Sequence, residues 1–255
     1  MIPTYTFFAV GKGNMTLVQF TNGVNVLVDC RRSENWPTPL EHLKSKISKL
    51  DMVVITHPHQ DHLTGLQELC EWFKPHVLWH NGRYCKPDPV YDDWSYYERL
   101  RNGKIPYCTS VQVRRGHRLT VGNSSIYVAG PTVPNLQDTE DDENNNSIIL
   151  AITTGNAKVV LTGDTEEEQW IATDLAPLGD VSVLANASVF LASHHGREDG
   201  FSKRALDVIK PQRIVISDGE PGETDATTKY EKVAPVSTTR KGSVVVRPSE
   251  VAATV

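Results

Sequence analysis

The sequence predicts a layered α/β (α+β) protein with two mixed β-sheets and helices on their outer faces. Three observations support this prediction. β-rich segments separated by glycine turns predict a meander of strands over residues 4–30. An apolar run at 52–55, a helical pattern and a β-rich run at 76–80 form a strand–helix–strand unit. Strands and helices then alternate to residue 247, and we expect a single domain over residues 1–255, long enough to bury its own core.

The remaining elements follow from periodicity and from turn residues. Apolar residues at helical spacing predict helices within 35–50, 63–73, 93–101 and 202–209, and from Thr165 onwards. β-branched runs predict strands within 110–128 and at 147–153, 158–162, 187–192, 213–217 and 243–247. The polar stretches 131–146 and 219–228 predict loops.

The composition limits the class of protein. The hydrophobic fraction (39%) and the charged fraction (22%) are typical of a globular protein in water. The net charge of −5 argues against a generally basic surface for nucleic acid. Four cysteines without a Cys-x-x-Cys pair predict reduced thiols: Cys30, Cys70, Cys85 and Cys108. With no secretory signal and no apolar run that would span a bilayer, we expect a cytoplasmic protein without a membrane partner.

A cluster of metal-ligand side chains directly follows the apolar run at 52–55. His57, His59, Asp61 and His62 fall within six positions. A single histidine is more often a hydrogen-bonded core residue, but four such side chains in one loop have no ordinary structural use. Imidazole nitrogens and a carboxylate suit a borderline metal such as zinc. The loop therefore predicts a metal site.

Further polar side chains follow other β-rich runs. They are Asp29, Asp164, His194 and His195. In a layered α/β domain the ends of such strands gather on one rim, where open sheets place their sites. Asp29 is expected to support the site, as an acceptor that fixes the tautomer of a histidine.

Together these residues provide ligands for two ions. We expect His57, His59 and one later histidine to bind the first ion. Asp61 and His62 would bind the second, and Asp164 would bridge the two with its two oxygens. Two divalent ions about 3.5–4 Å apart form the arrangement that activates water and stabilises a displaced oxygen.

The motif His57-x-His59-x-Asp61-His62 resembles the signature of the metallo-β-lactamase superfamily. The chain resembles in more detail the soluble metallohydrolase domain of the ComEC competence proteins and its stand-alone relatives. The marks it shares with them are Val10–Asn14, Asp29, Asn144–Ser147, Leu161–Asp164, His194–Gly196, Asp225-Ala226 with Tyr230, and Thr238–Ser243. This resemblance implies a four-layer αβ/βα sandwich and a hydrolase, plausibly of phosphodiesters.

The resemblance also implies roles for individual residues. Many superfamily members carry a histidine between the first cluster and the bridging aspartate, where this chain offers Asn144 and Asn145 as supporting residues or weak ligands. The last ligand of the superfamily typically follows its strand directly, which favours His194. His195 would then donate a proton to the leaving oxygen, and Asp61 would orient the nucleophile as well as bind metal.

The leading hypothesis is a metal-dependent phosphodiesterase or nuclease that uses two Zn²⁺ or Mn²⁺ ions. Its partner would be a phosphodiester substrate, with nucleic acid among the candidates, and three arginines would steer it: Arg114, Arg115 and Arg118. A hydrolase of a small ester, a lactone or a phosphocholine-type substrate is the first alternative, and the acidic net charge favours it. The second is a metal-stabilised binding or regulatory protein without catalysis, which the asparagine stretch favours.

Overall fold

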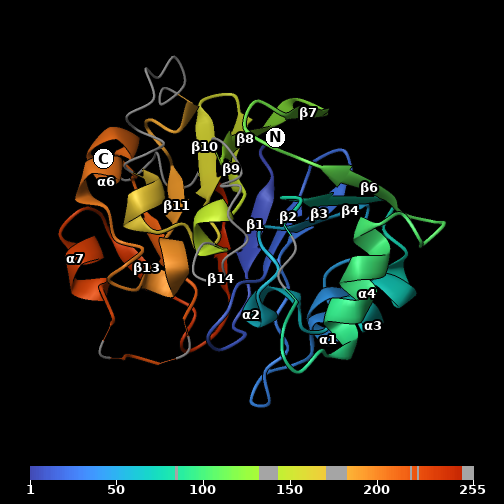
Figure 1. Cartoon of the computed structure of the whole chain (residues 1–255). Coiled ribbons are helices and arrows are strands. Elements are labelled where there is room, and N and C mark those ends of the chain that lie inside the picture. The colour runs from blue at the N-terminus through green and yellow to red at the C-terminus, as the bar shows by residue number, and fades with distance from the viewer. Residues whose placement is uncertain (84–85, 132–142, 171–182, 219, 223, 249–255) are drawn as a thin grey trace.

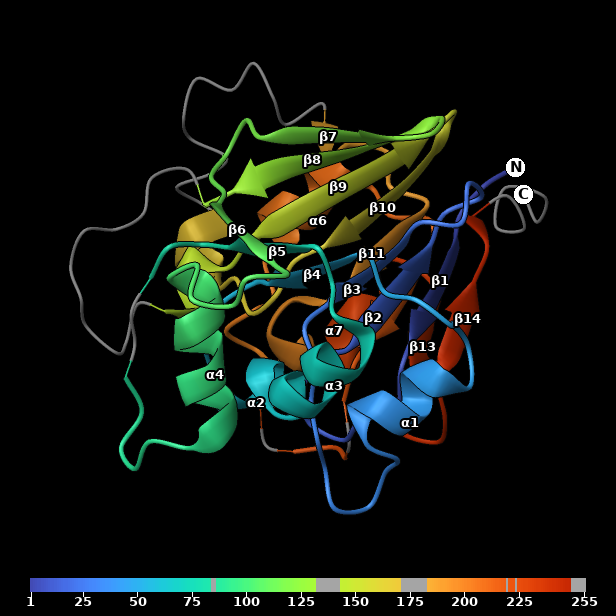
Figure 2. The same ribbon diagram turned by 90° about the vertical axis from the view of Figure 1, so that its right-hand side faces the viewer.

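Two seven-stranded sheets pack face to face, and helices cover the outer face of each, as the computed structural model shows (Figures 1 and 2). The structure describes residues 1–83, 86–131, 143–170, 183–218, 220–222 and 224–248. This arrangement confirms the predicted fold class of two mixed sheets with helices outside. The predicted loop 131–146 and the predicted helix from Thr165 extend into residues outside these ranges, and so does Cys85.

The first sheet contains the chain's opening strands and its closing strand. In chain order its strands are β1 (Thr4–Phe7), β2 (Thr16–Gln19), β3 (Asn25–Val28), β4 (Met52–Ile55), β5 (Val77–His80), β6 (Thr109–Gln112) and β14 (Val244–Val246). Their spatial order is β14-β1-β2-β3-β4-β5-β6. Pairing is antiparallel from β14 to β3 and parallel from β3 to β6. The sheet is therefore mixed, and β4, which lies in its parallel half, leads directly into the histidine loop.

The second sheet comes from the later part of the chain. Its strands are β7 (Arg118–Val121), β8 (Ser124–Gly130), β9 (Ile149–Thr154), β10 (Ala157–Leu161), β11 (Val189–Leu191), β12 (Ile214–Ile216) and β13 (Val236–Thr238). Their order is β13-β12-β11-β10-β9-β8-β7. β7 to β10 pair antiparallel, whereas β10 to β13 pair parallel. Here too the parallel half carries the candidate ligands at its strand ends.

Helices lie outside the two sheets. On the first sheet they are α1 (Pro39–Lys44), α2 (Gln60–Leu63), α3 (Leu66–Phe73) and α4 (Asp92–Arg101), and on the second α6 (Lys203–Ile209) and α7 (Thr227–Glu231). Short 3₁₀ turns occur at Asn144–Asn146 and Ser193–Gly196. Among the described residues, no helix has the length and hydropathy needed to cross a bilayer.

Alternation along the strands produces three buried layers. On β3 and β4, Val26, Val28 and Val54 point into the layer between the sheets, whereas Leu27 and Val53 point toward the helices. Both sets are buried because each sheet is covered on both faces. A third layer lies between the second sheet and its helices. The described cysteines, Cys30, Cys70 and Cys108, are buried free thiols.

Two local predictions differ from the structure. The predicted helix over 63–73 is interrupted at Gly65, which adopts φ +92°, and a Cβ there would lie 2.6 Å from Pro39 Cγ. The Asp93 carboxylate accepts the backbone N–H groups of Gly65 and Gln67, and so caps α3. The second difference lies near the C-terminal end, where α7 begins at Thr227, inside the predicted loop 219–228. β13 follows at residues for which the sequence predicts no strand.

Candidate metal centre

The loop after β4 is held in place by Asp29. Asp29 follows β3 in a left-handed conformation (φ +57°) and is buried. Its carboxylate accepts the Thr56 backbone N–H and the Thr56 hydroxyl, each at 2.8 Å. The same carboxylate lies 2.8 Å from His62 Nδ1. This contact favours a proton on His62 Nδ1 and leaves Nε2 free to face the rim, which is the supporting position expected for Asp29.

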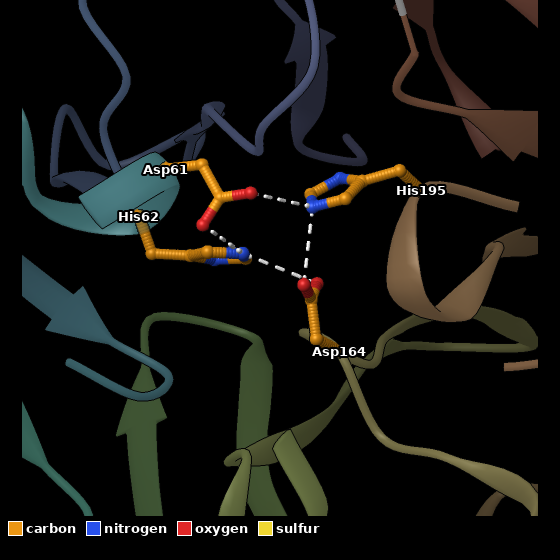
Figure 3. A group of neighbouring side chains, drawn as sticks. All are labelled: Asp61, His62, Asp164 and His195. Atoms are coloured by element: carbon orange, nitrogen blue, oxygen red, sulfur yellow. Dashed lines mark ion pairs between the residues drawn. The ribbon is translucent and has the colours of Figure 1, made fainter. Parts of the chain in front are cut away.

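Four side chains converge where the two sheets meet: Asp61, His62, Asp164 and His195, called here the central group (Figure 3). Asp164 Oδ1 lies 3.1 Å from His62 Nε2, and Asp164 Oδ2 lies 3.0 Å from His195 Nε2. Asp61 Oδ2 is 3.4 Å from His195 Nε2, and Asp61 Oδ1 is 4.0 Å from His62 Nε2. All four ligand atoms lie within 4.8 Å of one another.

The chemistry of this group fits a divalent ion. Although the atoms approach to 3.0–3.1 Å, His62 Nε2, His195 Nε2 and Asp164 Oδ1 are buried and form no hydrogen bond. Atoms that point at a common ion rather than at one another behave in this way. Ligands at about 2.0–2.2 Å from an ion lie about 3–3.5 Å from each other. The imidazole and carboxylate set suits Zn²⁺ or Mn²⁺.

His57 and His59 lie beside the central group. The ring of His57 is 4.1 Å from that of His62 and 4.6 Å from that of His59, measured between centroids. Ser147 Oγ lies 3.2 Å from His57 Nδ1 and accepts the Asp164 backbone N–H at 3.0 Å. His57 Nε2 is buried and forms no hydrogen bond with the described residues. Ser147 therefore joins the histidine loop to the loop that carries Asp164.

Two glycines allow the loops to approach this closely. A Cβ on Gly163 (φ +55°) would lie 2.9 Å from both Ser147 and Thr56. A Cβ on Gly13 (φ +140°) would lie 2.7 Å from the Asp61 carbonyl oxygen. The Gly13 carbonyl also accepts the Ser217 hydroxyl after β12 at 2.8 Å. The early glycine turn, noted in the sequence only for its resemblance, thus contacts both halves of the site.

His194 and His195 lie on a turn after β11 and point to different groups. Both adopt left-handed conformations, with φ of 48° and 55°. His195 completes the central group, whereas His194 Nε2 is 3.8 Å from Asp164 Oδ2. His194 Nδ1 instead faces the carboxylate of Asp199 at 2.9 Å. The structure therefore brings His195 together with Asp61, His62 and Asp164, and places His194, the histidine preferred from the sequence, at the edge of this group.

The asparagine stretch supports a neighbouring loop. Asn144 Nδ2 donates to Glu166 Oε1 at 2.7 Å, and Asn145 Oδ1 accepts the Glu166 backbone N–H at 3.1 Å. These bonds place both amides against Glu166, the second residue after Asp164. Of the two roles considered for Asn144 and Asn145, the geometry favours support.

Burial and mutual attraction shift the pKa values of the central group. Burial lowers the pKa of His62, but the carboxylates of Asp164 and Asp29 outweigh it and raise this pKa well above its usual range. Burial likewise lowers the pKa of His195, but Asp164 brings it to about 9. Burial raises the pKa of Asp164, but His195 and His62 hold it well below its usual range. Without an ion, the imidazoles carry protons opposite ionised carboxylates, and a divalent ion displaces these protons.

A cavity of about 190 Å³ opens beside His195. Its walls carry charges of both signs: Lys12, Arg197, Asp218, Glu220 and Asp225. Arg240 forms ion pairs with both Asp218 and Asp225. Among the described residues, Lys12 and Arg197 have no carboxylate partner, and Arg197 donates to Thr224 Oγ1 at 3.1 Å. The sequence indicated neither cation as part of a site, because they become neighbours of His195 only in the folded chain.

The arginines predicted to steer substrate lie on the connection between the outer strands β6 and β7. Arg114 and Arg115 lie in the turn, and Arg118 begins β7, where its guanidinium stacks on the ring of Tyr127 at 4.7 Å. The cavity beside His195 is lined by other residues. A steering role for these arginines remains a prediction.

A two-sheet α/β sandwich with a histidine–aspartate centre at its rim defines a class of metal-dependent hydrolases. The family model described as the metallo-beta-lactamase superfamily matches residues 9–216, and the chain belongs to this superfamily. Membership confirms the resemblance inferred from the histidine motif. It establishes a divalent-metal hydrolase fold, with the candidate ligands grouped as the geometry shows.

The sequences of related proteins match parts of this chain. ComE operon protein 3 of Bacillus subtilis (strain 168) is 25% identical over 179 residues, which cover 68% of this chain and 20% of that protein. The anti-Pycsar protein Apyc1 of Bacillus phage vB_BsuM-Goe3 is 44% identical over 83 residues, which cover 29% of this chain and 31% of that protein. The matches thus span a third or less of these relatives. Among solved structures, the metallo-beta-lactamase fold protein YhfI from Bacillus subtilis aligns with a TM-score of 0.61 at 14% identity, covering 96% of this chain and 99% of that one.

Proposed function

We propose that this chain is a metal-dependent phosphodiesterase, with nucleic acid among its candidate substrates. The observation that carries the proposal is the position of Asp164. Its two carboxylate oxygens face different imidazoles, His62 at 3.1 Å and His195 at 3.0 Å, at the junction of the two sheets. Asp164 is also linked to the histidine loop, because Ser147 Oγ accepts its backbone N–H and lies 3.2 Å from His57 Nδ1. Asp164 would therefore serve both the ion of the central group and a second ion at His57 and His59, the two-metal arrangement used for in-line displacement at phosphorus.

The ligands divide into two sets that share Asp164. The central group would hold one Zn²⁺ or Mn²⁺ ion. His57 and His59 would hold a second ion together with Asp164, and the buried Nε2 of His57, which forms no hydrogen bond with the described residues, supports this assignment. In this proposal the two late histidines exchange the roles expected of them: His195 would be a ligand of the central ion, and His194 would not.

The residues of the site have separate tasks in hydrolysis. Bound ions supply positive charge that lowers the pKa of a water molecule and offsets charge that develops on the phosphoryl group. Asp61, on the first turn of α2, orients that water as well as binding metal. His194 Nε2 faces the same rim and is placed to donate a hydrogen bond to a phosphoryl or leaving oxygen. Lys12 and Arg197 attract the anionic substrate to the cavity beside His195.

A substrate panel tests this proposal. Protein loaded with Mn²⁺ or Zn²⁺ is incubated with bis-p-nitrophenyl phosphate and single-stranded DNA, and in parallel with a lactone and p-nitrophenyl acetate. We expect the phosphodiesters to be cleaved, with loss of cleavage after EDTA and recovery when metal is restored. Asp61→Asn should lose this activity, whereas Asp207→Asn, an exposed carboxylate paired with Lys203 at 2.6 Å, should keep it.

The alternatives appear as distinct outcomes of the same panel. Cleavage of the lactone or the acetate ester without cleavage of a phosphodiester favours a small-ester hydrolase and contradicts the proposal. Metal-dependent thermal stability without turnover of any compound favours a binding or regulatory protein, and it contradicts the proposal equally.

A further inference from the structure

A second group of metal-ligand side chains lies on the opposite side of His194 from Asp164. It consists of Glu166, His194 and Asp199, called here the side group. His194 Nδ1 is 2.9 Å from Asp199 Oδ1 and 3.6 Å from Glu166 Oε1. These spacings agree with the separation of about 3–3.5 Å expected of atoms that share one ion.

His194, like the histidines of the central group, has a buried ring nitrogen that lies close to a carboxylate oxygen without forming a hydrogen bond. His194 is only 9% exposed, and its Nδ1 forms no hydrogen bond in spite of the carboxylate oxygen at 2.9 Å. An imidazole oriented by a carboxylate directs its N–H at the oxygen. Here the nitrogen approaches the oxygen without that alignment, as His62 and His195 do in the central group. The buried Nδ1 therefore needs a partner other than the carboxylate.

Charge also favours a cation in this position. Among the described residues, no Lys or Arg forms an ion pair with Glu166 or Asp199, although the two carboxylates share one imidazole. The side chain of Asp199 is 44% exposed, so an ion can enter from solvent. Two negative charges brought together beside an unpaired nitrogen are stabilised by a divalent cation.

The surrounding chain holds the side group in place. Asn144 and Asn145 bond to Glu166 through its Oε1 and its backbone N–H. The backbone N–H of Glu167 donates to the Asp199 carbonyl at 2.8 Å, which ties the two acidic segments together. The asparagine turn thus fixes one ligand of the side group, which gives these residues a role near the rim.

We propose that Glu166, His194 Nδ1 and Asp199 bind a divalent first-row transition ion that is separate from the ion of the central group and from the ion expected at His57 and His59. One nitrogen and two carboxylate oxygens leave further coordination positions to water, and this set suits Mn²⁺ or Zn²⁺. An ion on Nδ1 keeps the imidazole proton on Nε2, which faces Asp164 Oδ2 at 3.8 Å. The proposal concerns metal binding and does not depend on the reaction that the central group performs.

Metal counting tests the proposal. The purified chain is saturated with Mn²⁺, freed of excess, and its bound metal is measured by mass spectrometry of the digested protein. We expect Asp199→Asn and Glu166→Gln to bind one ion fewer per chain than the wild type. Asp207→Asn, which alters an exposed carboxylate that is paired with Lys203, should bind as many ions as the wild type. Circular dichroism confirms that each variant is folded.

The same substitution in a His195→Ala variant distinguishes an ion bound by the side group from an ion of the central group that Asp199 only helps to hold. In His195→Ala, we expect Asp199→Asn to remove one further ion. Equal counts in the wild type and Asp199→Asn overturn the proposal. A loss that occurs only when His195 is present also overturns it, because Asp199 would then act by orienting His194 beside the central group.

Discussion

His194 and His195 are neighbours in sequence, and both have left-handed backbones, yet they belong to different chemical groups. His195 Nε2 lies 3.0 Å from Asp164 and 3.4 Å from Asp61, inside the central group. His194 turns its Nδ1 to Asp199 and Glu166 and approaches Asp164 only to 3.8 Å. Adjacent side chains on a tight turn point in different directions, so position after a strand does not by itself decide which one binds metal.

The largest effect should come from His195. His195→Ala removes an atom from the central group, and we expect phosphodiester turnover at saturating Mn²⁺ to fall about 10³-fold, the upper range for loss of one electrostatic group. Steady-state kinetics on bis-p-nitrophenyl phosphate measures the change. Turnover within a few-fold of wild type would exclude His195 as a ligand.

His194→Ala should have a smaller effect. It removes a hydrogen-bond donor at the rim but leaves the central group intact, so we expect kcat to fall about 10²-fold with metal-dependent turnover retained. The same assay, repeated over a range of Mn²⁺ concentrations, gives kcat and the metal dependence separately. If His194→Ala is as inactive as His195→Ala, the distinction between the two histidines fails.

Asp29→Asn tests the support that the first sheet gives to the central group. The carboxylate that binds Thr56 and His62 Nδ1 becomes an amide, so the tautomer of His62 is less well fixed. Loss of such a partner typically costs about 10–100-fold in metal affinity or activity. Competition with a fluorescent chelator measures the affinity. An unchanged affinity would show that Asp29 serves the fold alone.

The smallest expected effect is a change of thermal stability with pH. In metal-free protein Asp164 raises the pKa of His195 to about 9, above the value of about 6.5 for an unfolded histidine. The resulting stability is fully present below about pH 6.5 and is lost as the pH rises through about 9. Metal-loaded protein should behave in the opposite way, because ions bind better when these protons have left.

Thermal unfolding of EDTA-treated and Mn²⁺-loaded samples between about pH 6 and about pH 9.5 checks this sign. We expect Tm to fall by a few degrees across this range without metal and to rise with metal. If Tm changes with pH in the same way in both samples, the account of protonated imidazoles that metal replaces is contradicted.

Much of the fold could be predicted because its signals are local. β4 occupies the predicted residues Met52–Ile55, and α4 begins one residue before the predicted helix. The strand ends that carry Asp29, His57, Asp164 and His195 also meet as expected, since parallel strands deliver their ends to one rim.

What could not be predicted depends on contacts distant in sequence. The break at Gly65 reflects Pro39 and the cap from Asp93, and β13 is a three-residue strand whose parallel pairing with β12 is not visible in its sequence. Lys12 becomes a neighbour of His195 only through folding. The different orientations of His194 and His195 depend on left-handed backbone angles, which neither residue type indicates.

The position of the ions tests the central claim most directly. Crystals of the Mn²⁺-loaded chain, measured at the manganese absorption edge, reveal each ion as an anomalous peak. We expect a peak about 2.0–2.2 Å from His195 Nε2, bound also by Asp61, His62 and Asp164. A peak bound by His194 Nε2, with His195 Nε2 left without metal, would contradict the account.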